Sequence, residues 1–431
     1  MASIKKRGDS YLIIVSLGRD AQDKKISKAT TFKPTAQTPA KIRKEVEEFA
    51  RNYERRVLNG EYIEGDEITF EEFAGKIWKA NWLDRNTKMT ARVKEDYLRI
   101  LRSRIIPAIG RLKLNKIRAT EIDGILHDMT DSGKAPKTVR HTFTVINSVM
   151  KYAYKKEFIK ENPCDRCDDL PTVERDTKLH AFTIEQGMTF LNALEQEYIV
   201  SAPAHTRKQA SGDYSVAGYE YSQTISTMWK AYFHLAFFGG FRRGEMCALT
   251  WEDIDFDECS IKINKASSLT KASGQIVKDP KTKTSIREIT VPEQCIDILR
   301  KWKAEERLMM MRFGSAWEGR RDDFEKQNVF IQVQNGKPIR VDTPSHKFRE
   351  ILDRYNASCE DEIQRLPIIR LHDLRHTMIT YLLANGLDPM TASKRAGHSK
   401  PSTTMDIYGE VLKSQDRKAA NMLQDLFFAQ G

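Results

Sequence analysis

Residues 371–376 read Leu-His-Asp-Leu-Arg-His, and the assignment of the fold starts from this stretch. His372 and Arg375 are three residues apart, so on a helix both side chains can point at one site. Asp373 lies at the expected helix start, where a carboxylate interacts favourably with the helix dipole. A solvated helix start would show the same residues, so the meaning of the stretch depends on what else the chain carries.

Three other short stretches carry polar side chains in comparable settings. They are Gly240–Glu245, Gly397–Ser399 and Met405–Gly409. In the first, glycines permit a tight turn into a helix, and Arg242 and Glu245 share one face of it. In the second, Gly397 is typical of a helix C-cap, and His398 would project from the following turn. Tyr408 in the third would, by itself, be an aromatic residue packed on a helix face.

Together these stretches supply two arginines, two histidines and a tyrosine, the groups that metal-free attack on a phosphodiester requires. The pentacoordinate transition state places extra negative charge on the non-bridging oxygens, and guanidinium forks match that geometry. A histidine can remove the proton of the nucleophile or donate a hydrogen bond. A phenol, with a pKa of about 10, must be deprotonated to attack, but it leaves well enough to make its ester reversible.

The reaction also needs a general acid for the 5′-oxygen leaving group, and two lysines can supply it. Lys281 and Lys283 both lie in the polar turn Pro280–Arg287, between two expected strands. Lys281 is the favoured candidate and Lys283 is its rival. A similar choice exists at the first arginine, where Arg243 is a lesser rival because the spacing after the glycines favours Arg242.

The order Arg, Lys, His-x-x-Arg, His, Tyr resembles the tyrosine recombinase (phage integrase) family, and the match covers nearly the whole chain. The motifs that carry it are GGFRRGE (239–245), PKTKTSIRE (280–288), LHDLRH (371–376), AGHS (396–399) and DIYGEV (406–411). Each motif is weak alone, whereas five in order and at sensible separations are specific. The resemblance implies a multidomain fold, mainly α with small β-sheets, and a mixed α/β catalytic domain of the tyrosine recombinase type.

The resemblance also implies a role for each matching residue. Arg242 and Arg375 would clamp the scissile phosphate. Glu245 would hold the geometry of its neighbour without being catalytic itself. Lys281 would be the general acid.

The remaining roles belong to the two histidines and the tyrosine. His372 would be proton acceptor and phosphate ligand, His398 a hydrogen-bonding ligand and Tyr408 the nucleophile. Tyr408 would form a 3′-phosphotyrosyl link and free a 5′-hydroxyl, which attacks the partner strand through a Holliday junction. The phosphodiester energy stays in the protein–DNA bond, so neither ATP nor a metal or other cofactor is expected.

The composition favours a polyanionic partner. The 431 residues carry a formal net charge of +11, and 40% of them are hydrophobic. A basic excess favours phosphate backbones because binding releases condensed counterions. No apolar run approaches the roughly 18–20 residues that a bilayer needs, and the first ten residues lack the apolar segment of a secretory signal. We therefore expect a cytoplasmic protein without membrane contact. The resemblance implies a bacterial host, with the protein acting on its nucleoid.

The cysteines do not suggest a structural or redox site. Six of them are scattered through the chain, which is not the pattern of a disulfide framework. Cys164 and Cys167 form the only CxxC pair, and one pair cannot close a tetrahedral zinc site. No metal site is therefore expected.

The first of three blocks, residues 1–65, is expected to be a small β-sheet plus helix. Tyr11–Val15 and Thr30–Lys33 read as strands, and Pro39–Leu58 as an amphipathic helix. Residues 1–34 hold eight Lys or Arg against three Asp or Glu, which favours a phosphate-facing surface. The resemblance implies a three-stranded domain here that binds arm-type DNA sites.

The second block, residues 66–170, is helical by pattern, with an apolar stripe beginning at Phe70 and a chain break at Pro107 and Gly110. Interleaved basic residues favour a DNA-clamping helical domain, which the resemblance identifies as the core-binding domain. The candidate DNA-contacting residues of the first two blocks are Lys5, Lys6, Arg7, Lys24, Lys25, Arg99, Arg102, Arg104, Arg111, Lys113 and Lys151.

The third block, residues 176–431, is expected to be the catalytic domain with a C-terminal tail. Expected strands are Ser260–Asn264 and Ser285–Val291. Expected helices are Cys295–Met311, Pro344–Tyr355, Asp373–Ala384, Met390–Arg395 and Pro401–Val411. The polar stretch Glu195–Gln223 reads as a surface insertion.

The tail after Tyr408 is too apolar for a free end. Its apolar residues are Val411, Leu412, Met422, Leu423, Leu426, Phe427 and Phe428. The resemblance implies that such a tail docks on a neighbouring protomer, within a homo-tetramer on DNA. Docking back on its own domain is the alternative.

We therefore expect a site-specific recombinase, the integrase of a prophage or an integrative/conjugative element, acting on double-stranded attachment sites. An excision factor or a host DNA-bending protein would be its further partners. A resolvase- or inversion-type recombinase usually lacks an arm-binding domain, so the basic residues 1–65 argue for integration. The three-block layout counts against a type IB topoisomerase, and a non-catalytic DNA-binding regulator would not need Tyr408.

Overall fold

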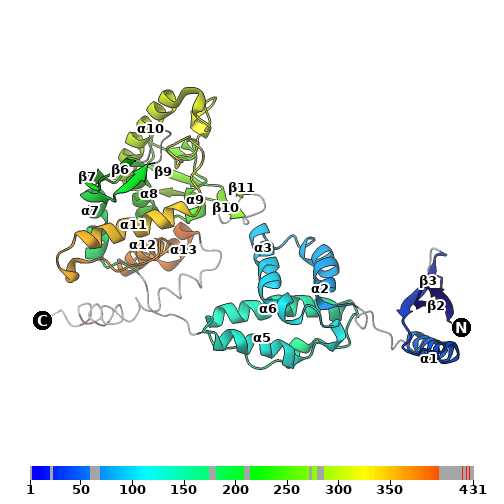
Figure 1. The fold of residues 1–431 in the computed structure, drawn as a ribbon. Coiled ribbons are helices and arrows are strands. Elements are labelled where there is room, and N and C mark those ends of the chain that lie inside the picture. The colour runs from blue at the N-terminus through cyan, green and yellow to red at the C-terminus, as the bar shows by residue number, and fades with distance from the viewer. Residues whose placement is uncertain are drawn as a thin grey trace. The chain divides into compact units, whose positions relative to one another are not determined.

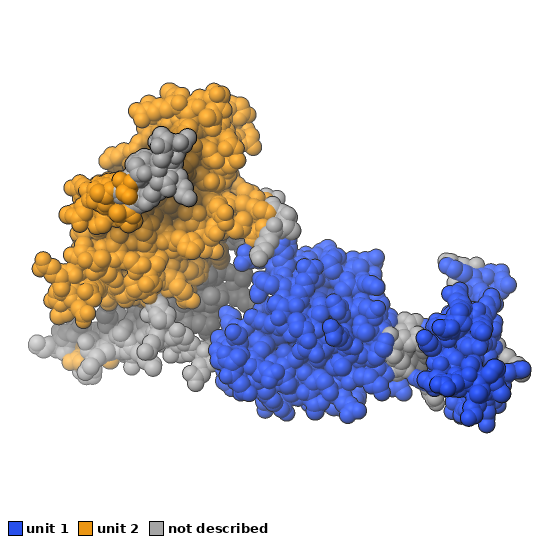
Figure 2. Space-filling model, in the orientation of Figure 1, with its two compact units in different colours: residues 1–174 blue, residues 175–431 orange. Residues whose placement is uncertain are grey.

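The computed structural model describes residues 2–19, 23–58, 68–173, 181–207, 214–270, 274–278 and 286–397, together with residues 420, 424 and 427. The chain divides into two compact units, residues 1–174 and 175–431, which Figure 2 colours separately. The predicted domain boundaries fall at or beside residues 59–67 and 174–180, outside the described residues, so they stay predictions.

A three-stranded antiparallel sheet and one helix form the amino-terminal part of the first unit (Figure 1). They are β1 (Ser3–Arg7), β2 (Ser10–Arg19), β3 (Lys25–Phe32) and α1 (Pro39–Leu58). Ile13 and Val15 of β2 lie in one buried cluster with Tyr53 and Val57 of α1, so the helix covers one face of the sheet. The helix has the predicted bounds.

Only part of this sheet is visible in the sequence pattern. β2 and β3 extend beyond the predicted strands, because their ladder continues past an irregularity between Ser16 and Gly18. Every residue of β1 is exposed, so no alternation of apolar and polar residues marks it as a strand.

Residues 68–173 form a helical body around one buried cluster. Its helical segments are α2 (Phe70–Glu72), η2 (Phe73–Leu83), α3 (Ala91–Ile100), η3 (Leu101–Ile105), α4 (Ile106–Ile109), η4 (Leu114–Lys116), α5 (Ala119–Asp131), α6 (Pro136–Lys155) and η5 (Pro163–Arg166). Thr69 and Glu72 cap the first helix reciprocally. The predicted break before Leu112 is confirmed at Gly110, the C-cap that follows Ile109, but Pro107 does not contribute to it: this proline lies in the first turn of α4, directly after η3. The change of helical winding between η3 and α4 accommodates the missing N–H.

The second unit combines short antiparallel sheets with helices. Its helical segments are α7 (Ile184–Glu195), α8 (Thr227–His234), η6 (Leu235–Gly239), α9 (Arg243–Met246), η7 (Trp251–Asp253), α10 (Glu293–Phe313), η9 (Gly314–Ala316), η10 (Phe324–Lys326), α11 (Thr343–Ser358), η11 (Glu362–Gln364), α12 (Asp373–Ala384) and α13 (Pro389–Ala396). Its strands are β4 (Glu197–Ala202), β5 (His205–Arg207), β6 (Tyr214–Val216), β7 (Tyr219–Thr224), β8 (Ile254–Asp255), β9 (Ser260–Ile263), β10 (Ala266–Thr270), β11 (Gly274–Lys278) and β12 (Arg287–Thr290). One sheet has the order β12-β9-β8, and β10–β11, β4–β7 and β5–β6 are two-stranded ribbons.

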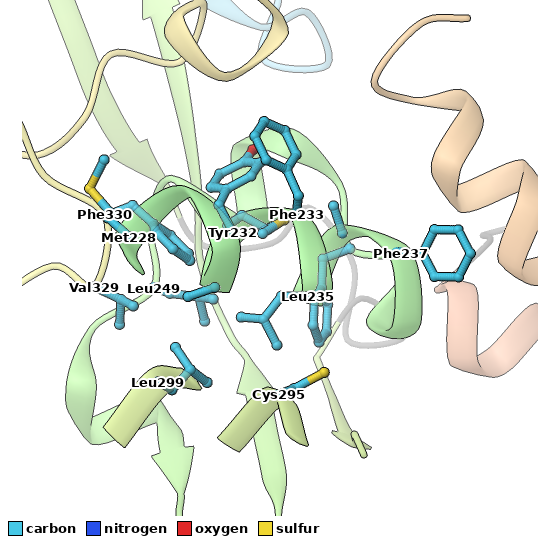
Figure 3. Close-up of a cluster of buried hydrophobic side chains, with 14 of the residues drawn as sticks. Met228, Tyr232, Phe233, Leu235, Phe237, Leu249, Cys295, Leu299, Val329 and Phe330 are labelled. Carbon is cyan, nitrogen blue, oxygen red and sulfur yellow. The ribbon is translucent and has the colours of Figure 1, made fainter. Parts of the chain in front are cut away.

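The helix α8, continued by η6, runs through the core of the second unit. Tyr232, Phe233 and Leu235 are fully buried on it. Figure 3 shows them among apolar side chains of other elements, which include Leu249, Cys295, Leu299, Val329 and Phe330. Because η6 ends at Gly239, this core fixes the point at which the GGFRRGE stretch begins.

Most predicted elements of the second unit are present with small shifts at their ends. The helix Asp373–Ala384 has the predicted bounds, and the two predicted strands correspond to β9 and β12. The insertion Glu195–Gln223 forms the ribbons β4–β7 and β5–β6, and Ile199 on β4 is 76% exposed. The predicted helix Pro401–Val411 and the apolar tail lie outside the described residues, except that the side chain of Phe427 is exposed.

Cys164 and Cys167 are free thiols at and just after η5. Across the described parts of the chain, no three His, Cys, Asp or Glu side chains are grouped so that they could hold a metal ion. Nor does any helix in those parts have the length and apolar character needed to cross a membrane.

Glu306 on α10 is a fully buried carboxyl group. It accepts hydrogen bonds from Trp251 Nε1 at 2.9 Å and from Gln327 Nε2 at 3.1 Å. Burial disfavours the charged form and outweighs both hydrogen bonds, so it raises the pKa of Glu306 to about 8. The side chain thus ties α10 to η7 in a largely protonated form at neutral pH.

This raised pKa predicts a loss of stability with rising pH. The ordinary pKa of a glutamate is 4.5, so between about pH 5 and pH 8 the folded protein retains a proton that the unfolded chain releases. Relative to Glu306→Gln, which does not titrate, the wild type should lose on the order of a few kcal/mol of unfolding free energy across this range. Denaturant unfolding of both proteins at several pH values measures this difference, and parallel pH profiles would contradict it.

Candidate active site

Arg375 on α12 is a buried cation, with 1% of its surface exposed. Its Nη1 donates to the carbonyl oxygen of Gly240 at 2.7 Å, and its Nη2 donates to the carbonyl oxygen of Ala396. The side chain therefore joins the turn after η6 to the end of α13. Burial and then the nearby Arg242 lower the pKa of Arg375 to about 9, so the group keeps its charge at neutral pH.

The turn that receives Arg375 requires glycine. Gly240 has a φ of +58°, in the left-handed region, and a Cβ there would lie 2.1 Å from Met378 Cε. Met378 lies on α12, so the turn and α12 are in close contact. The predicted tight turn into a helix is confirmed, because α9 begins at Arg243.

Arg242 stands immediately before α9 and pairs with Glu245 as the spacing predicts. Its Nη1 donates to Glu245 Oε1 at 2.8 Å, and its backbone N–H donates to Glu245 Oε2 at 2.9 Å. Its Nη2 donates to the carbonyl oxygen of Gly397, the C-cap of α13. The rival Arg243 points elsewhere, since its Nη1 donates to Ser345 Oγ at 2.8 Å.

Glu245 also receives a second arginine. Arg287, the first residue of β12, donates from Nη2 to Glu245 Oε2 at 2.7 Å and from Nη1 to Glu245 Oε1 at 3.1 Å. Burial acts to raise the pKa of Glu245, but the hydrogen bonds and charge of Arg287, and then the bonds from Arg242, lower it overall. Glu245 is therefore ionised at neutral pH although it is buried.

His372 is the residue that precedes α12, and it stands beside both arginines. Although its side chain is exposed on one side, the surrounding protein atoms disfavour the charged ring. Burial of the rest of the ring, then the neighbouring His376, Arg375 and Arg242, lower the pKa of His372 to about 4, and only Asp373 opposes them. The ring is consequently neutral at physiological pH, which is the form that can accept a proton.

The start of α12 is held by Asp373. This buried carboxylate accepts bonds from the backbone N–H of Arg370 at 2.8 Å and from its Nε and Nη2 at 3.1 and 2.9 Å. Thr377 Oγ1 donates to the carbonyl of Asp373 and accepts from the backbone N–H of Phe182. Asp373 thus fixes the turn that carries His372, rather than only favouring the helix dipole.

The structure brings together the predicted residues Arg242, Glu245, His372 and Arg375. Four other predicted residues, Lys281, Lys283, His398 and Tyr408, lie outside the described residues. Two of them are neighbours in the sequence of described site residues. Lys283 is four residues before Arg287, and His398 follows Gly397 directly.

Arg287 is the one residue of this network that received no role from the sequence. It is part of the PKTKTSIRE motif (280–288), which the sequence marks for its lysines. Nothing in the residue order distinguishes it from an exposed arginine at a strand start, because its partner Glu245 is on a distant segment. Its side chain is in fact only 8% exposed.

The described site carries excess positive charge. Arg242, Arg287 and Arg375 bring three positive charges, of which the carboxylate of Glu245 balances one by pairing with Arg242 and Arg287, and His372 is neutral, which leaves two positive charges in excess. Fixed donors of this kind suit a group whose negative charge increases in the transition state, as that of a phosphodiester does.

The candidate DNA-contacting residues of the first unit are mostly exposed. Exposed side chains are Lys5, Lys6, Arg7, Lys24, Lys25, Arg99, Arg102, Arg111, Lys113 and Lys151. Arg104 differs, because it is half-buried and donates to Thr142 Oγ1 at 3.1 Å, so it has a packing role between η3 and α6. Lys151 borders a hollow of about 840 Å³ that Trp82, Tyr97 and Lys155 also line.

Two family descriptions match the chain. The one described as "Phage integrase family" matches residues 215–415, and the one described as "Phage integrase central domain" matches residues 70–169. The ICEBs1 integrase of Bacillus subtilis (strain 168) is 27% identical over 314 residues, covering 73% of this chain and 72% of that protein. A "Tyrosine recombinase XerC-like" protein of Caldanaerobacter subterraneus is 24% identical over 438 residues, covering 98% of each.

Solved structures share the fold at lower identity. The Tn1549 transposon integrase in complex with transposon right end DNA has a TM-score of 0.61 and 18% identity, covering 82% of this chain and 100% of that one. A lambda integrase tetramer bound to a Holliday junction has a TM-score of 0.51 and 14% identity, covering 94% of both.

The turn at Gly240 yields a prediction on stability. Gly240→Ala should lower the melting temperature more than Gly386→Ala does in the same unit. Both alanines would take a positive φ, a conformation that costs roughly 1–2 kcal/mol, but a Cβ at Gly386 meets nothing within 4 Å. The variant at Gly240 must in addition move the Cε end of the buried Met378 side chain on α12. Equal melting temperatures for the two variants, measured by calorimetry, would show that the turn has room for a side chain.

Proposed function

This chain belongs to the phage integrase family, and on that premise we propose how it works and which residues carry each step. It is a tyrosine recombinase, and its function is that of a site-specific integrase of a mobile element. The fold, a multidomain and mainly helical one with small separate sheets, is that of tyrosine recombinase integrases. The steps and residue assignments below are our proposal.

The convergence of Arg242 and Arg375 beside His372 carries the proposal. Arg242 and Arg375 would hold the non-bridging oxygens of the scissile phosphate, and the site's two excess charges would match the charge that develops there. Bonds from both arginines to the carbonyls that end α13 support this role, because they fix the guanidinium groups before DNA binds.

Tyr408 would then attack the phosphorus atom. Its phenolic proton would pass to His372, whose lowered pKa keeps a neutral acceptor available at physiological pH. His398 would donate a hydrogen bond to the phosphate. The bond from phosphorus to the 5′-oxygen breaks, Lys281 supplies the proton to that oxygen, and Tyr408 remains joined to the 3′-phosphate. Attack by a 5′-hydroxyl of the partner strand reverses these steps and yields a Holliday junction.

Double-stranded attachment-site DNA would be the substrate. The exposed basic side chains of β1 and of residues 99–113 support roles for residues 1–65 as the arm-binding domain and for residues 66–170 as the core-binding domain. The DNA complexes of the Tn1549 integrase support the same partner. We propose that the element is a prophage or an integrative/conjugative element of a bacterium, as for the ICEBs1 relative, so that the protein works on the host nucleoid.

A homo-tetramer on DNA, joined by exchange of the apolar tail, would be the working assembly. The lambda integrase tetramer on a Holliday junction supports this arrangement. The exposed ring of Phe427 agrees with a tail that has a partner surface elsewhere. An excision factor or a host DNA-bending protein would set the direction of the reaction.

A nicked suicide substrate tests the nucleophile. With a duplex carrying the attachment core, taken from the direct repeats that flank the element, the wild type should accumulate as a covalent protein–DNA complex. Tyr408→Phe should give no such complex while binding the same DNA, because the attacking oxygen is gone. Tyr221→Phe, at an exposed tyrosine of β7, is the matched control and should trap DNA like the wild type. Equal trapping by Tyr408→Phe would show that the nucleophile lies elsewhere.

A change of leaving group decides between the two lysines. Lys281→Met should slow cleavage of ordinary DNA by about 10²–10⁴-fold, the usual worth of a general acid. A substrate with sulfur in place of the bridging 5′-oxygen needs no proton on leaving, so Lys281→Met should cleave it nearly as fast as the wild type. Lys283→Met should be close to the wild type on both substrates. The opposite pattern would assign the acid to Lys283.

A further inference from the structure

We infer that Arg287 is a positioning residue of the active site, which acts on the phosphate clamp through Glu245 and does not touch the phosphate itself. The inference rests on the proposed function, because it concerns the rate of the same strand cleavage. It goes beyond the six catalytic residues that the motifs predict, because Arg242 is the only described one of them that bonds to Glu245.

The hydrogen bonds of Arg287 use all three nitrogens of its guanidinium group. Nη1 and Nη2 form a two-pronged pair with the two oxygens of Glu245, at 3.1 and 2.7 Å. Nε donates to the carbonyl oxygen of Arg395 at 3.1 Å. A bidentate pair fixes the plane of a carboxylate as well as its distance. Glu245 is therefore held in one orientation, the one in which its Oε1 also accepts from Arg242.

Burial and charge pairing together separate Arg287 from Arg242 in function. The side chain of Arg287 is 8% exposed, whereas that of Arg242 is 37% exposed. Arg375 is also buried, but its charge meets only carbonyl oxygens among its described partners, whereas both Nη atoms of Arg287 donate to the carboxylate of Glu245. Of the two arginines on Glu245, Arg242 is therefore the ligand and Arg287 the support.

Arg287 also joins three segments that meet at the site. It begins β12, whose ladder to β9 pairs it with Ile263. Through Glu245 it reaches the start of α9, and through the carbonyl of Arg395 it reaches the end of α13. The guanidinium group also packs on the C-cap of α13, since a Cβ at Gly397 would lie 2.8 Å from Arg287 Nη1.

These contacts matter because three candidate catalytic residues adjoin the same segments in the sequence. Lys281 and Lys283 precede Arg287 by six and four residues, and His398 is the residue after Gly397. A single buried side chain thus fixes the described residues that adjoin the proposed acid and the second histidine in the sequence, and it bonds to the same carboxylate as the first arginine.

The charge of Arg287 keeps Glu245 ionised. Burial acts to raise the pKa of Glu245, and Arg287 is the first of the groups that lower it. Without Arg287 the pKa should rise, and a protonated Glu245 would hold Arg242 more weakly. The clamp should then fail progressively as the pH falls, in a range where Glu245 of the wild type stays ionised.

The test compares full-length wild type, Arg287→Met, Arg287→Lys, Glu245→Gln and the double variant Glu245→Gln/Arg287→Met on the nicked suicide substrate. Single-turnover rates of covalent complex formation are measured between pH 6 and pH 9, with DNA affinity and melting temperature recorded for each protein. Arg349→Met, which removes an exposed arginine paired with Asp353 on α11, is the matched control.

Arg287→Met should cleave about 10²-fold more slowly than the wild type, the usual effect of a displaced catalytic group, at nearly unchanged DNA affinity. Its rate relative to the wild type should fall further as the pH is lowered. Arg287→Lys should restore part of the rate and flatten this acid limb, because it returns the charge without the fork. In the Glu245→Gln background the Arg287→Met change should have little further effect and no acid limb, since the group it acts through no longer titrates.

Wild-type rates in a folded Arg287→Met protein would overturn the inference, as would a loss that is fully additive with that of Glu245→Gln. If Arg287→Met alone unfolds, the comparison of Glu245→Gln with the double variant still decides, because the double variant buries no unpaired carboxylate. Equal rates for those two support the inference, and a much lower rate in the double variant overturns it. Absence of a covalent complex with the wild type would instead overturn the proposed function, and this inference with it.

Discussion

The site depends on one buried carboxylate, Glu245, that is shared by two arginines from separate segments. A charge in this position is costly to bury unless it is paired and hydrogen-bonded. Arg287 and Arg242 supply that pairing, and their hydrogen bonds offset the free-energy cost of burying the carboxylate. The same bonds fix the start of α9 relative to β12. Removing Glu245 would leave the buried Arg287 without its carboxylate, and removing Arg287 would leave Glu245 with only Arg242 to balance its charge among its described ion pairs. The arrangement therefore holds the first arginine in place without any bound ligand.

The second arginine is held by a different device. Arg375 bonds only to carbonyl oxygens among its described partners, those of Gly240 and Ala396, so its charge is not neutralised by a carboxylate of its own. Backbone carbonyls at the ends of helices carry partial negative charge, which orients a guanidinium group without cancelling it. Together with the neutral His372, this gives the site a net positive charge and a proton acceptor at the same pH. Both properties are set by burial and by neighbouring charges.

Agreement between pattern and structure is best where local forces decide. α1 and α12 have the predicted bounds, and in α1 the buried residues Val46, Ala50, Tyr53 and Val57 recur at helical spacing. Pro107 was misread because its effect depends on the winding of the preceding helix. The exposed strand β1 was missed by pattern because it is recognised only by the ladder it forms with β2. The hydrogen bond from Arg104 to Thr142 was not visible in the sequence, because Thr142 is on another helix.

By itself the sequence determined the family, the order of the motifs and the identity of Arg242, Glu245, His372 and Arg375 as a group, because residue types at fixed short spacings specify chemistry. Tertiary structure alone decided that Arg287 joins Glu245 and that the His372 ring is neutral. These outcomes depend on distances between segments remote in the chain and on how much water each group retains. Such quantities are set by packing, and no local pattern of residues encodes them.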